Sequence, residues 1–366
     1  MLRKNWLFLA LGLGFTAMLT AAVPVGAQSS ALSLGTIDRK SITRLASCPA
    51  GFDSGMTCYR GAVENCQSTV DLGFTYGVEN PTQARLGTVV LLDGGGGTTP
   101  YSNPDYAKKY LANGYQIVYV AWDTPWEFTN GSTGNSIKNA ACRPATFLNY
   151  VYQNVYQNVY HNVYNRGGLC AQGISAGSAA VAYSLAWYGS SSYLDNVELL
   201  SGPVFGDIKE GCRVPNPPVL EVCGNSAPDC NGAPWPDSPS YVSIDIALVA
   251  RWSGQPSCNG INFTGASANA AWKAMSIVDG TDNPSFSYPQ TSLAGWLCSN
   301  GQNNSAAQGD FFYQQFTSPQ QTAGFSVTRI DNCAGAEGVS QGTTPQGKLG
   351  LDAITEHMIS ACVKRH

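Results

Sequence analysis

Leu169-Cys170-Ala171-Gln172-Gly173-Ile174-Ser175-Ala176-Gly177 is the stretch that decides the predicted fold. Residues 169–174 form an apolar run of the length of a buried strand, and the run 176–188 that follows favours a helix. The pentapeptide between them has the pattern G-x-S-x-G. Small residues beside Ser175 let the backbone turn sharply enough to lift the hydroxyl clear of a sheet. We therefore predict that Ser175 is a nucleophile at a strand–helix turn.

A second motif, Asp93-Gly94-Gly95-Gly96-Gly97, follows directly after the apolar run 87–92. Glycines allow backbone N–H groups to approach a developing oxyanion without interference from side chains. We expect an oxyanion hole made by Gly94, Gly95, Gly96 and Ala176, the residue after the predicted nucleophile. A phosphate-binding loop is disfavoured, because no Gly-Lys-Ser/Thr sequence follows and no G-x-G-x-x-G pattern opens a helix.

Strand-like and helix-like segments alternate through the middle and end of the chain. Short apolar runs are typical of strands buried on both faces of a parallel sheet. The predicted strands are residues 87–92, 116–121, 169–174, 197–201, 292–297 and 325–330. The predicted helices are residues 103–113, 143–165, 176–188, 306–316 and 348–363. This alternation predicts an α/β fold with a mostly parallel central sheet and flanking helices.

Residues 151–164 contain a short tandem repeat based on Val-Tyr-Gln-Asn. A period of four residues suits one side of a helix, although valine and tyrosine also favour strands. We expect a helix, because the next strand needs a crossover connection at this point.

The serine pentapeptide and the glycine loop resemble those of the α/β-hydrolase superfamily. The resemblance extends to the order of strands and helices over residues 85–363, and it is closest to the secreted, disulfide-containing carboxylic-ester hydrolases. It implies a catalytic triad in the chain order serine, acid, histidine. It also implies a small-molecule or polymeric ester as substrate, cleaved through an acyl-enzyme at Ser175.

A base for Ser175 is harder to place. The histidines are His161, His357 and His366, and only His357 has both the right chain order and a position away from the terminus. The loop after the last predicted strand, where the resemblance implies the histidine, carries Glu337 instead. We therefore weigh His357 equally as a catalytic base and as a histidine on the surface of the last helix.

The triad implied by the resemblance also needs an acid. The loop after the strand 292–297 has no carboxylate, and Asn304 stands where an acid would be expected. Asp310 is the first candidate, followed by Asp207 and Asp331. These departures raise an alternative, a degenerate hydrolase fold that binds ligands without turnover.

The composition excludes several classes of protein. The chain has 366 residues, of which 43% are hydrophobic and 12% are charged, and its formal net charge is −4. This hydrophobic content is too high for a disordered chain, and the negative charge argues against nucleic-acid binding. We expect residues 28–366 to form a single domain, with the proline- and cysteine-containing residues 202–270 as an inserted cap or lid.

Residues 1–27 have the pattern of a secretory signal peptide. Arg3 and Lys4 precede an apolar stretch, and Val25-Gly26-Ala27 offers small residues for cleavage. The stretch is shorter than a membrane-spanning helix, so we expect a secreted or periplasmic protein with no membrane contact after cleavage.

All 12 cysteines follow this segment, and an even number behind a signal peptide indicates disulfides. Their pairing stays open, although Cys58/Cys66 and Cys223/Cys230 are close in the sequence. A zinc site is disfavoured, because the chain has no Cys-x-x-Cys pair and only 3 histidines. We expect no metal and no cofactor, and the oligomeric state stays open.

Overall fold

A computed structural model describes most of the chain. The described residues are 32–66, 72–127, 137–157, 167–207, 276–278, 284–299, 304–333 and 338–365. The predicted signal peptide and nearly all of the predicted cap at 202–270 lie outside these ranges. In the described part of the chain, no helix is long and apolar enough to cross a membrane.

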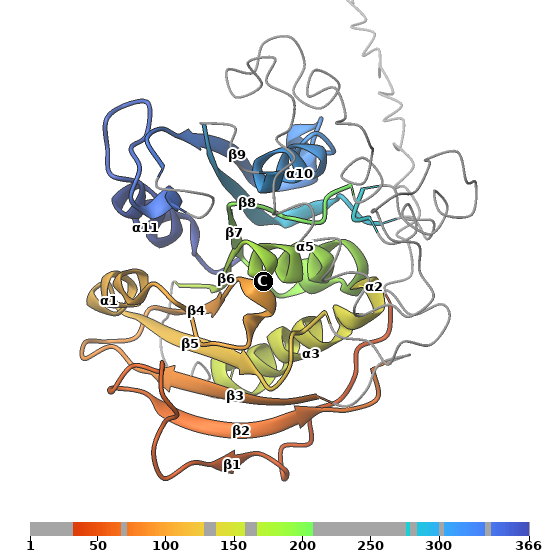
Figure 1. Cartoon of the computed structure of the whole chain (residues 1–366), viewed down its shortest axis with the longest axis vertical. Coiled ribbons are helices and arrows are strands. Elements are labelled where there is room, and N and C mark those ends of the chain that lie inside the picture. The colour runs from red at the N-terminus through yellow and green to blue at the C-terminus, as the bar shows by residue number, and fades with distance from the viewer. Residues whose placement is uncertain are drawn as a thin grey trace, which may run out of the picture.

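One nine-stranded sheet forms the centre of the structure, with the order β1-β2-β3-β5-β4-β6-β7-β8-β9 (Figure 1). Strands β4 to β9 pair in parallel, whereas β1, β2 and β3 are joined by antiparallel pairs, as is β3 with β5. The strands are β1 (Thr43–Arg44), β2 (Thr57–Val63), β3 (Leu72–Glu79), β4 (Gly87–Leu92), β5 (Tyr115–Trp122), β6 (Leu169–Ile174), β7 (Asn196–Leu200), β8 (Tyr288–Cys298) and β9 (Thr322–Ile330).

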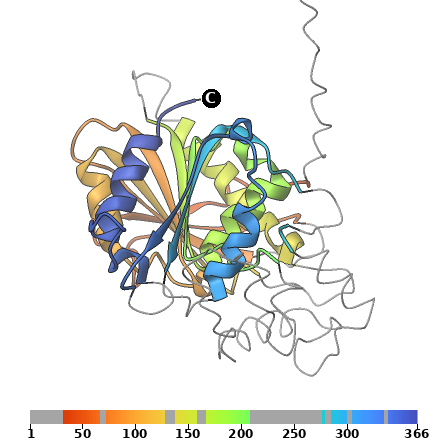
Figure 2. The same ribbon diagram turned by 90° about the horizontal axis from the view of Figure 1, so that it is seen from above.

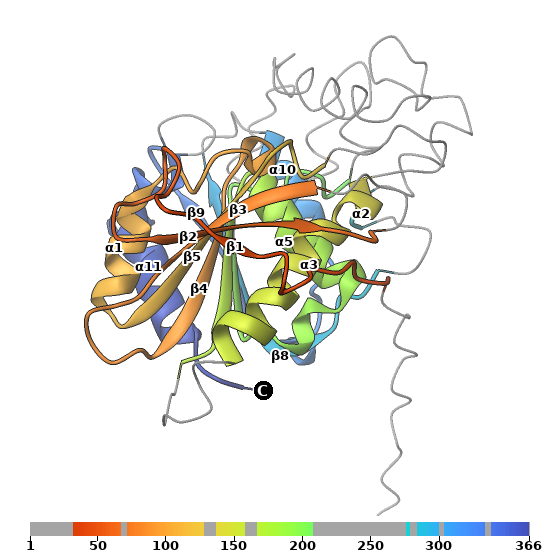
Figure 3. The same ribbon diagram turned by 90° about the horizontal axis from the view of Figure 1, so that it is seen from below.

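Helices cover both faces of this sheet (Figures 2 and 3). Helices α1 and α11 pack together on one face, and α3, α5 and α10 lie on the other, so each face has its own apolar core. In the described ranges, the helices are α1 (Pro104–Ala112), α2 (Ile137–Ala140), α3 (Cys142–Val151), α5 (Ala176–Tyr188), α10 (Asn304–Tyr313) and α11 (Gly350–Ala361).

The predicted α/β fold is confirmed, and the six predicted strands and the predicted helices 103–113, 176–188, 306–316 and 348–363 match the structure within a few residues at their ends. Residues 158–165 of the predicted helix 143–165 lie outside the described ranges. Strands β4 and β6 are buried along their whole length, which is why their apolar runs were visible in the sequence. Helix α1 begins where Asn103 caps it: its side chain accepts a hydrogen bond from the N–H of Asp105, and Pro104 occupies the first turn.

The valine–tyrosine repeat is helical as far as the structure describes it. Helix α3 continues into a wider helical turn, Tyr152–Tyr156, and residues 158–166 lie outside the described ranges. The sequence did not predict β2 and β3. Strand β2 alternates only weakly between buried and partly exposed residues, so its hydrophobic pattern is faint.

Four disulfides join described cysteines: Cys48–Cys58, Cys66–Cys142, Cys170–Cys362 and Cys298–Cys333. The close pair Cys58/Cys66 is therefore wrong as a disulfide. The reason is geometric. Cys58 lies near the start of β2, whereas Cys66 lies just beyond its end. Cys223/Cys230 lies outside the described residues.

Candidate active site

Ser175 occupies a sharp turn between β6 and α5. Its backbone has φ 52° and ψ −121°, a conformation that a residue with a side chain rarely adopts. The turn is held by the N–H of Ser175, which donates to the carbonyl of Leu200 on β7 at 2.9 Å. The side chain is half-buried, and within the described residues its hydroxyl has no hydrogen-bond partner.

Gly177 shows why the pentapeptide needs small residues. A Cβ built on Gly177 would lie 2.2 Å from the carbonyl oxygen of Leu92 and 2.6 Å from that of Asp93. The first turn of α5 therefore packs directly against the end of β4. This close approach brings the glycine loop after β4 beside Ser175.

The glycine loop forms a tight 3₁₀ turn at Gly95–Gly97, in which the N–H of Gly97 donates to the carbonyl of Gly94 at 2.9 Å. The N–H groups of Gly95, Gly96 and Ala176 donate to no group among the described residues. Unpaired N–H groups from a loop and a helix start, next to a serine hydroxyl, can bind a negatively charged oxygen.

Asp93 closes the loop that carries these glycines. Its buried carboxylate accepts hydrogen bonds from the N–H and hydroxyl of Ser102, at 3.2 and 2.9 Å, and from the hydroxyl of Thr99 at 3.1 Å. Burial raises the pKa of Asp93, and these hydrogen bonds oppose the shift. The carboxylate thus ties the two ends of the 93–102 loop together.

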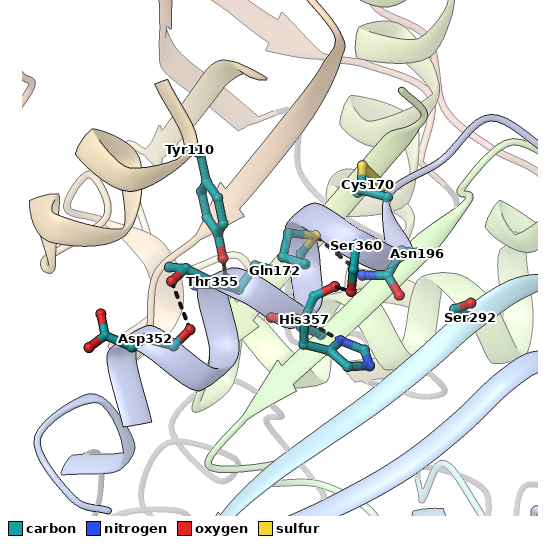
Figure 4. A network of polar contacts seen from close by, with 12 residues as sticks. Tyr110, Cys170, Gln172, Asn196, Ser292, Asp352, Thr355, His357 and Ser360 are labelled. Atoms are coloured by element: carbon teal, nitrogen blue, oxygen red, sulfur yellow. Dashed lines mark hydrogen bonds and ion pairs between the residues drawn. A yellow bond between two sulfur atoms is a disulfide. The ribbon is translucent and has the colours of Figure 1, made fainter. Parts of the chain in front are cut away.

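His357 lies on α11 (Figure 4), on the sheet face opposite α5. Its imidazole contacts a buried acid. Its Nδ1 is 2.8 Å from Oε1 of Glu198, a fully buried residue of β7. Burial raises the pKa of Glu198 to about 7, and the hydrogen bond with this carboxylate raises the pKa of His357. The ring of Trp296 packs edge-on against the imidazole, with 5.7 Å between centroids.

Strand register shows how far this pair lies from the serine turn. Glu198 is level with Gln172 on the neighbouring strand β6, three residues before Ser175. At a rise of roughly 3.3 Å per residue, the backbone of Glu198 lies about 10 Å further down the sheet than Ser175. His357 is hydrogen-bonded at that lower level, and no hydrogen bond joins it to Ser175 among the described residues.

Asp310, the first candidate for the acid, contacts a cation instead of a histidine. Both of its carboxylate oxygens lie 2.7 Å from Nη2 of Arg329 on β9. Burial raises the pKa of Asp310 and Arg329 opposes the shift. Asp207 is buried beside Gln308, whose side-chain oxygen accepts from the Asp207 N–H at 2.8 Å. Asp331 pairs its backbone with Thr343.

Other residues weighed from the sequence lie outside the described part of the chain, including Glu337, His161 and His366. Glu198, the partner of His357, is not among the candidates that the sequence pattern singles out. Its one signal was an acid inside the otherwise apolar run 197–201, where a buried charge requires a partner.

No family model matches the chain, and no curated protein matches it. Similar solved structures include an esterase of Pyrobaculum calidifontis, with 12% identity, coverage of 80% of this chain and 82% of that chain, and a TM-score of 0.46. A bacterial heroin esterase has 10% identity over 86% of each chain and a TM-score of 0.49. A thermophilic carboxylesterase from a metagenomic library has 12% identity over 83% of this chain and 89% of its own, with a TM-score of 0.48. Scores this low carry no argument about function.

The assignment of the fold rests on the chain's own elements. In the sheet, β5 precedes β4, which reverses their order in the chain. The earlier strands therefore lie on the side of β5, and the later strands lie on the side of β4. The serine turn follows a central parallel strand and opens a helix, and the glycine loop follows the adjacent strand β4. By these features the chain has the α/β-hydrolase fold.

Proposed function

We propose that this chain hydrolyses carboxylic esters through an acyl-enzyme on Ser175. The observation that carries the proposal is the strained turn at Ser175, whose hydroxyl lies beside the N–H groups of Gly95, Gly96 and Ala176, all without a hydrogen-bond partner in the part of the chain that the structure describes. Backbone strain at a residue with a side chain persists where the surrounding structure enforces it, and such strain is concentrated at functional sites.

The proposed reaction has two steps. The oxygen of Ser175 attacks the ester carbonyl carbon while the N–H groups hold the oxyanion, and the carbon–oxygen bond to the alcohol then breaks. The alcohol leaves with a proton, and the acyl group stays on Ser175. Water then attacks the acyl-enzyme and releases the carboxylic acid, which restores the serine hydroxyl.

Among the described residues, no proton acceptor is hydrogen-bonded to the hydroxyl of Ser175. A serine nucleophile needs a proton acceptor, and His357 is hydrogen-bonded to Glu198 at about 10 Å from the level of Ser175. This separation favours a second candidate function, the binding of acyl compounds without turnover. The two candidates differ in one property, which is whether Ser175 forms a covalent bond.

The test is hydrolysis of p-nitrophenyl acetate and p-nitrophenyl butyrate by residues 28–366 and by a Ser175→Ala variant. The matched control is Ser192→Ala, because the Ser192 hydroxyl is exposed and, among the described residues, donates to the carbonyl of Gly189 alone. We expect turnover by the parent chain and the control, and its loss in Ser175→Ala. Equal turnover in all three chains would overturn the proposal. No turnover, with saturable binding of the ester, would support the binding function.

The compartment is part of the same proposal. We propose that residues 1–27 direct secretion and that the mature chain acts in an oxidising compartment, which the four described disulfides support. The mass of the protein recovered from the culture medium tests this. A mature chain that begins near residue 28 is expected, and retention of the whole chain inside the cell would contradict it.

A further inference from the structure

Gln172 is a buried polar residue inside the strand that leads to the serine turn. It is completely buried in the otherwise apolar strand β6, and its side chain points to the sheet face that α1 and α11 cover. An amide in such a place is unfavourable unless its polar atoms have hydrogen-bond partners. The two partners of Gln172 therefore show which parts of the fold its amide joins.

Both partners are tyrosines that are themselves buried. The hydroxyl of Tyr110, in α1, donates to Oε1 of Gln172 (Figure 4). Nε2 of Gln172 donates to the hydroxyl oxygen of Tyr101 at 2.6 Å. The amide thus joins β6 to a helix through its acceptor and to the loop before that helix through its donor.

Tyr101 belongs to the loop that carries the predicted oxyanion hole. This loop leaves β4 at Asp93 and passes through the turn Gly95–Gly97 before it enters α1. Ser102, the residue after Tyr101, donates its N–H and its hydroxyl to the carboxylate of Asp93. The tyrosine is therefore one residue from the point at which the loop closes on its own start.

The side chain of Tyr101 reaches from this loop to the face of the sheet. Strand register places Gln172 level with Leu91, the second-last residue of β4, so the amide lies below the start of the loop on the neighbouring strand. The ring of Tyr101 also lies against those of Tyr106 and Tyr119, with centroids 6.0 and 6.1 Å away. The hydrogen bond to Gln172 therefore connects the glycine loop to the strand that carries the predicted nucleophile.

We propose that Gln172 and Tyr101 are positioning residues for the oxyanion hole: their hydrogen bond fixes the glycine loop relative to the strand that ends before Ser175. This inference rests on the proposed function, because it assumes that Gly95 and Gly96 bind an oxyanion next to Ser175. Both side chains are buried, so they act through the backbone and not on the substrate. What they hold constant is the distance between the nucleophile and the N–H groups, to which the rate is sensitive.

Two changes of one oxygen each test the inference, because each removes one partner of the same amide. Tyr101→Phe removes the hydrogen bond on the loop, and Tyr110→Phe, the matched control, removes the hydrogen bond on α1. Three properties are measured: hydrogen exchange of the peptide 93–102, kcat and KM for p-nitrophenyl butyrate, and the rate at which a fluorophosphonate labels Ser175.

In Tyr101→Phe we expect faster exchange in the peptide 93–102, because the loop loses a connection to β6. We expect kcat and the labelling rate to fall by about tenfold, with KM within about twofold, because a displaced N–H group weakens binding of the transition state. In Tyr110→Phe the exchange of this peptide, kcat and the labelling rate should all stay within about twofold of the parent chain.

Gln172→Met removes the amide and keeps the length of the side chain. It should be about as slow as Tyr101→Phe, and the double variant should be little slower than either, because both changes break the same bond. Gln172→Met also serves as the test if Tyr101→Phe does not fold. A loss in Tyr101→Phe that Gln172→Met does not reproduce would assign the effect to another contact of Tyr101 and overturn the inference.

The remaining outcomes separate the inference from the proposed function. Parent values of kcat and labelling in Tyr101→Phe, or equal losses in Tyr110→Phe, would overturn the inference and leave the proposed function intact. If the parent chain neither turns over ester nor takes up the label, the proposed function fails and the catalytic part of the inference fails with it. The exchange data then show separately whether the hydrogen bond holds the loop.

Discussion

Nδ1 of His357 lies 2.8 Å from Oε1 of Glu198, and this bond joins helix α11 to the middle of strand β7. The acid is completely buried and the imidazole is about one-third exposed. An acid that orients an imidazole through Nδ1 is the arrangement used in catalytic triads, but here it lies on the face of the sheet and not at the edge that carries Ser175. The main effect of the Glu198–His357 pair is therefore to stabilise the packing of α11 on the sheet.

The first prediction concerns the pH dependence of stability. Burial raises the pKa of Glu198 from 4.5 to about 7, so the folded chain binds this proton more tightly than the unfolded chain. The pKa of His357 is also raised, by its hydrogen bond to Glu198. Both contributions to stability are complete below the unfolded pKa values and are lost as the pH rises through the folded ones.

We therefore expect the free energy of unfolding in urea to fall as the pH rises from about 5 to about 8. In Glu198→Gln this fall should be smaller by about 2 kcal/mol. Glu356→Gln, on the exposed side of α11, should keep the full pH dependence. An unchanged slope in Glu198→Gln would show that the buried pair does not control it.

The second prediction concerns His357 as a base. Because its imidazole is hydrogen-bonded about 10 Å below the level of Ser175, we expect His357→Gln to lower the melting temperature but to change the rate of Ser175 labelling by less than about threefold. A fall of about a hundredfold or more would instead make His357 the proton acceptor. Glu337→Gln, measured in parallel, tests the carboxylate that follows β9 in the sequence.

The third prediction concerns Asp310. Asp310→Asn removes the charge that pairs with Arg329 in a site where both side chains are mostly buried. We expect a loss of about 2 kcal/mol in the free energy of unfolding, with kcat unchanged. Asp352→Asn breaks an exposed pair with Lys109 and should cost less than about 0.5 kcal/mol. A loss of kcat in Asp310→Asn without a loss of stability would restore Asp310 as the catalytic acid.

The fourth prediction concerns the disulfide between Cys170 and Cys362. It joins the start of β6 to the end of α11 across 192 residues, whereas Cys48–Cys58 spans only 10. From loop closure alone, replacing the long-range pair with alanine should cost about 5 kcal/mol and replacing the short-range pair about 3 kcal/mol. Thermal or urea unfolding of both variants measures the two losses of stability. A larger loss for the Cys48–Cys58 variant would contradict the prediction.

The sequence predicted the elements whose pattern is local. Strand β6 and helix α5 were predictable because a mostly apolar run is followed at once by a turn of small residues. Strand β2 was not, because its burial depends on pairing with β3, which no local pattern reveals. The disulfides were likewise out of reach, since Cys66 pairs with Cys142 across 76 residues.

The candidate site shows the same difference between features set by local sequence and features set by long-range contacts. The positions of Ser175 and of the glycine loop follow from short motifs that set their own backbone geometry. The partner of His357 depends on which side of α11 faces the sheet and on the register of β6 with β7.

The central claim is that Ser175 is a covalent nucleophile, and intact-protein mass spectrometry after treatment with a fluorophosphonate tests it most directly. Attack by the serine oxygen forms an oxygen–phosphorus bond and releases fluoride and a proton, so the chain gains the mass of one phosphonyl group. We predict a single adduct that maps to the peptide containing Ser175 and is absent in Ser175→Ala. A parent chain that stays unmodified, or an adduct that persists in Ser175→Ala, would contradict the account.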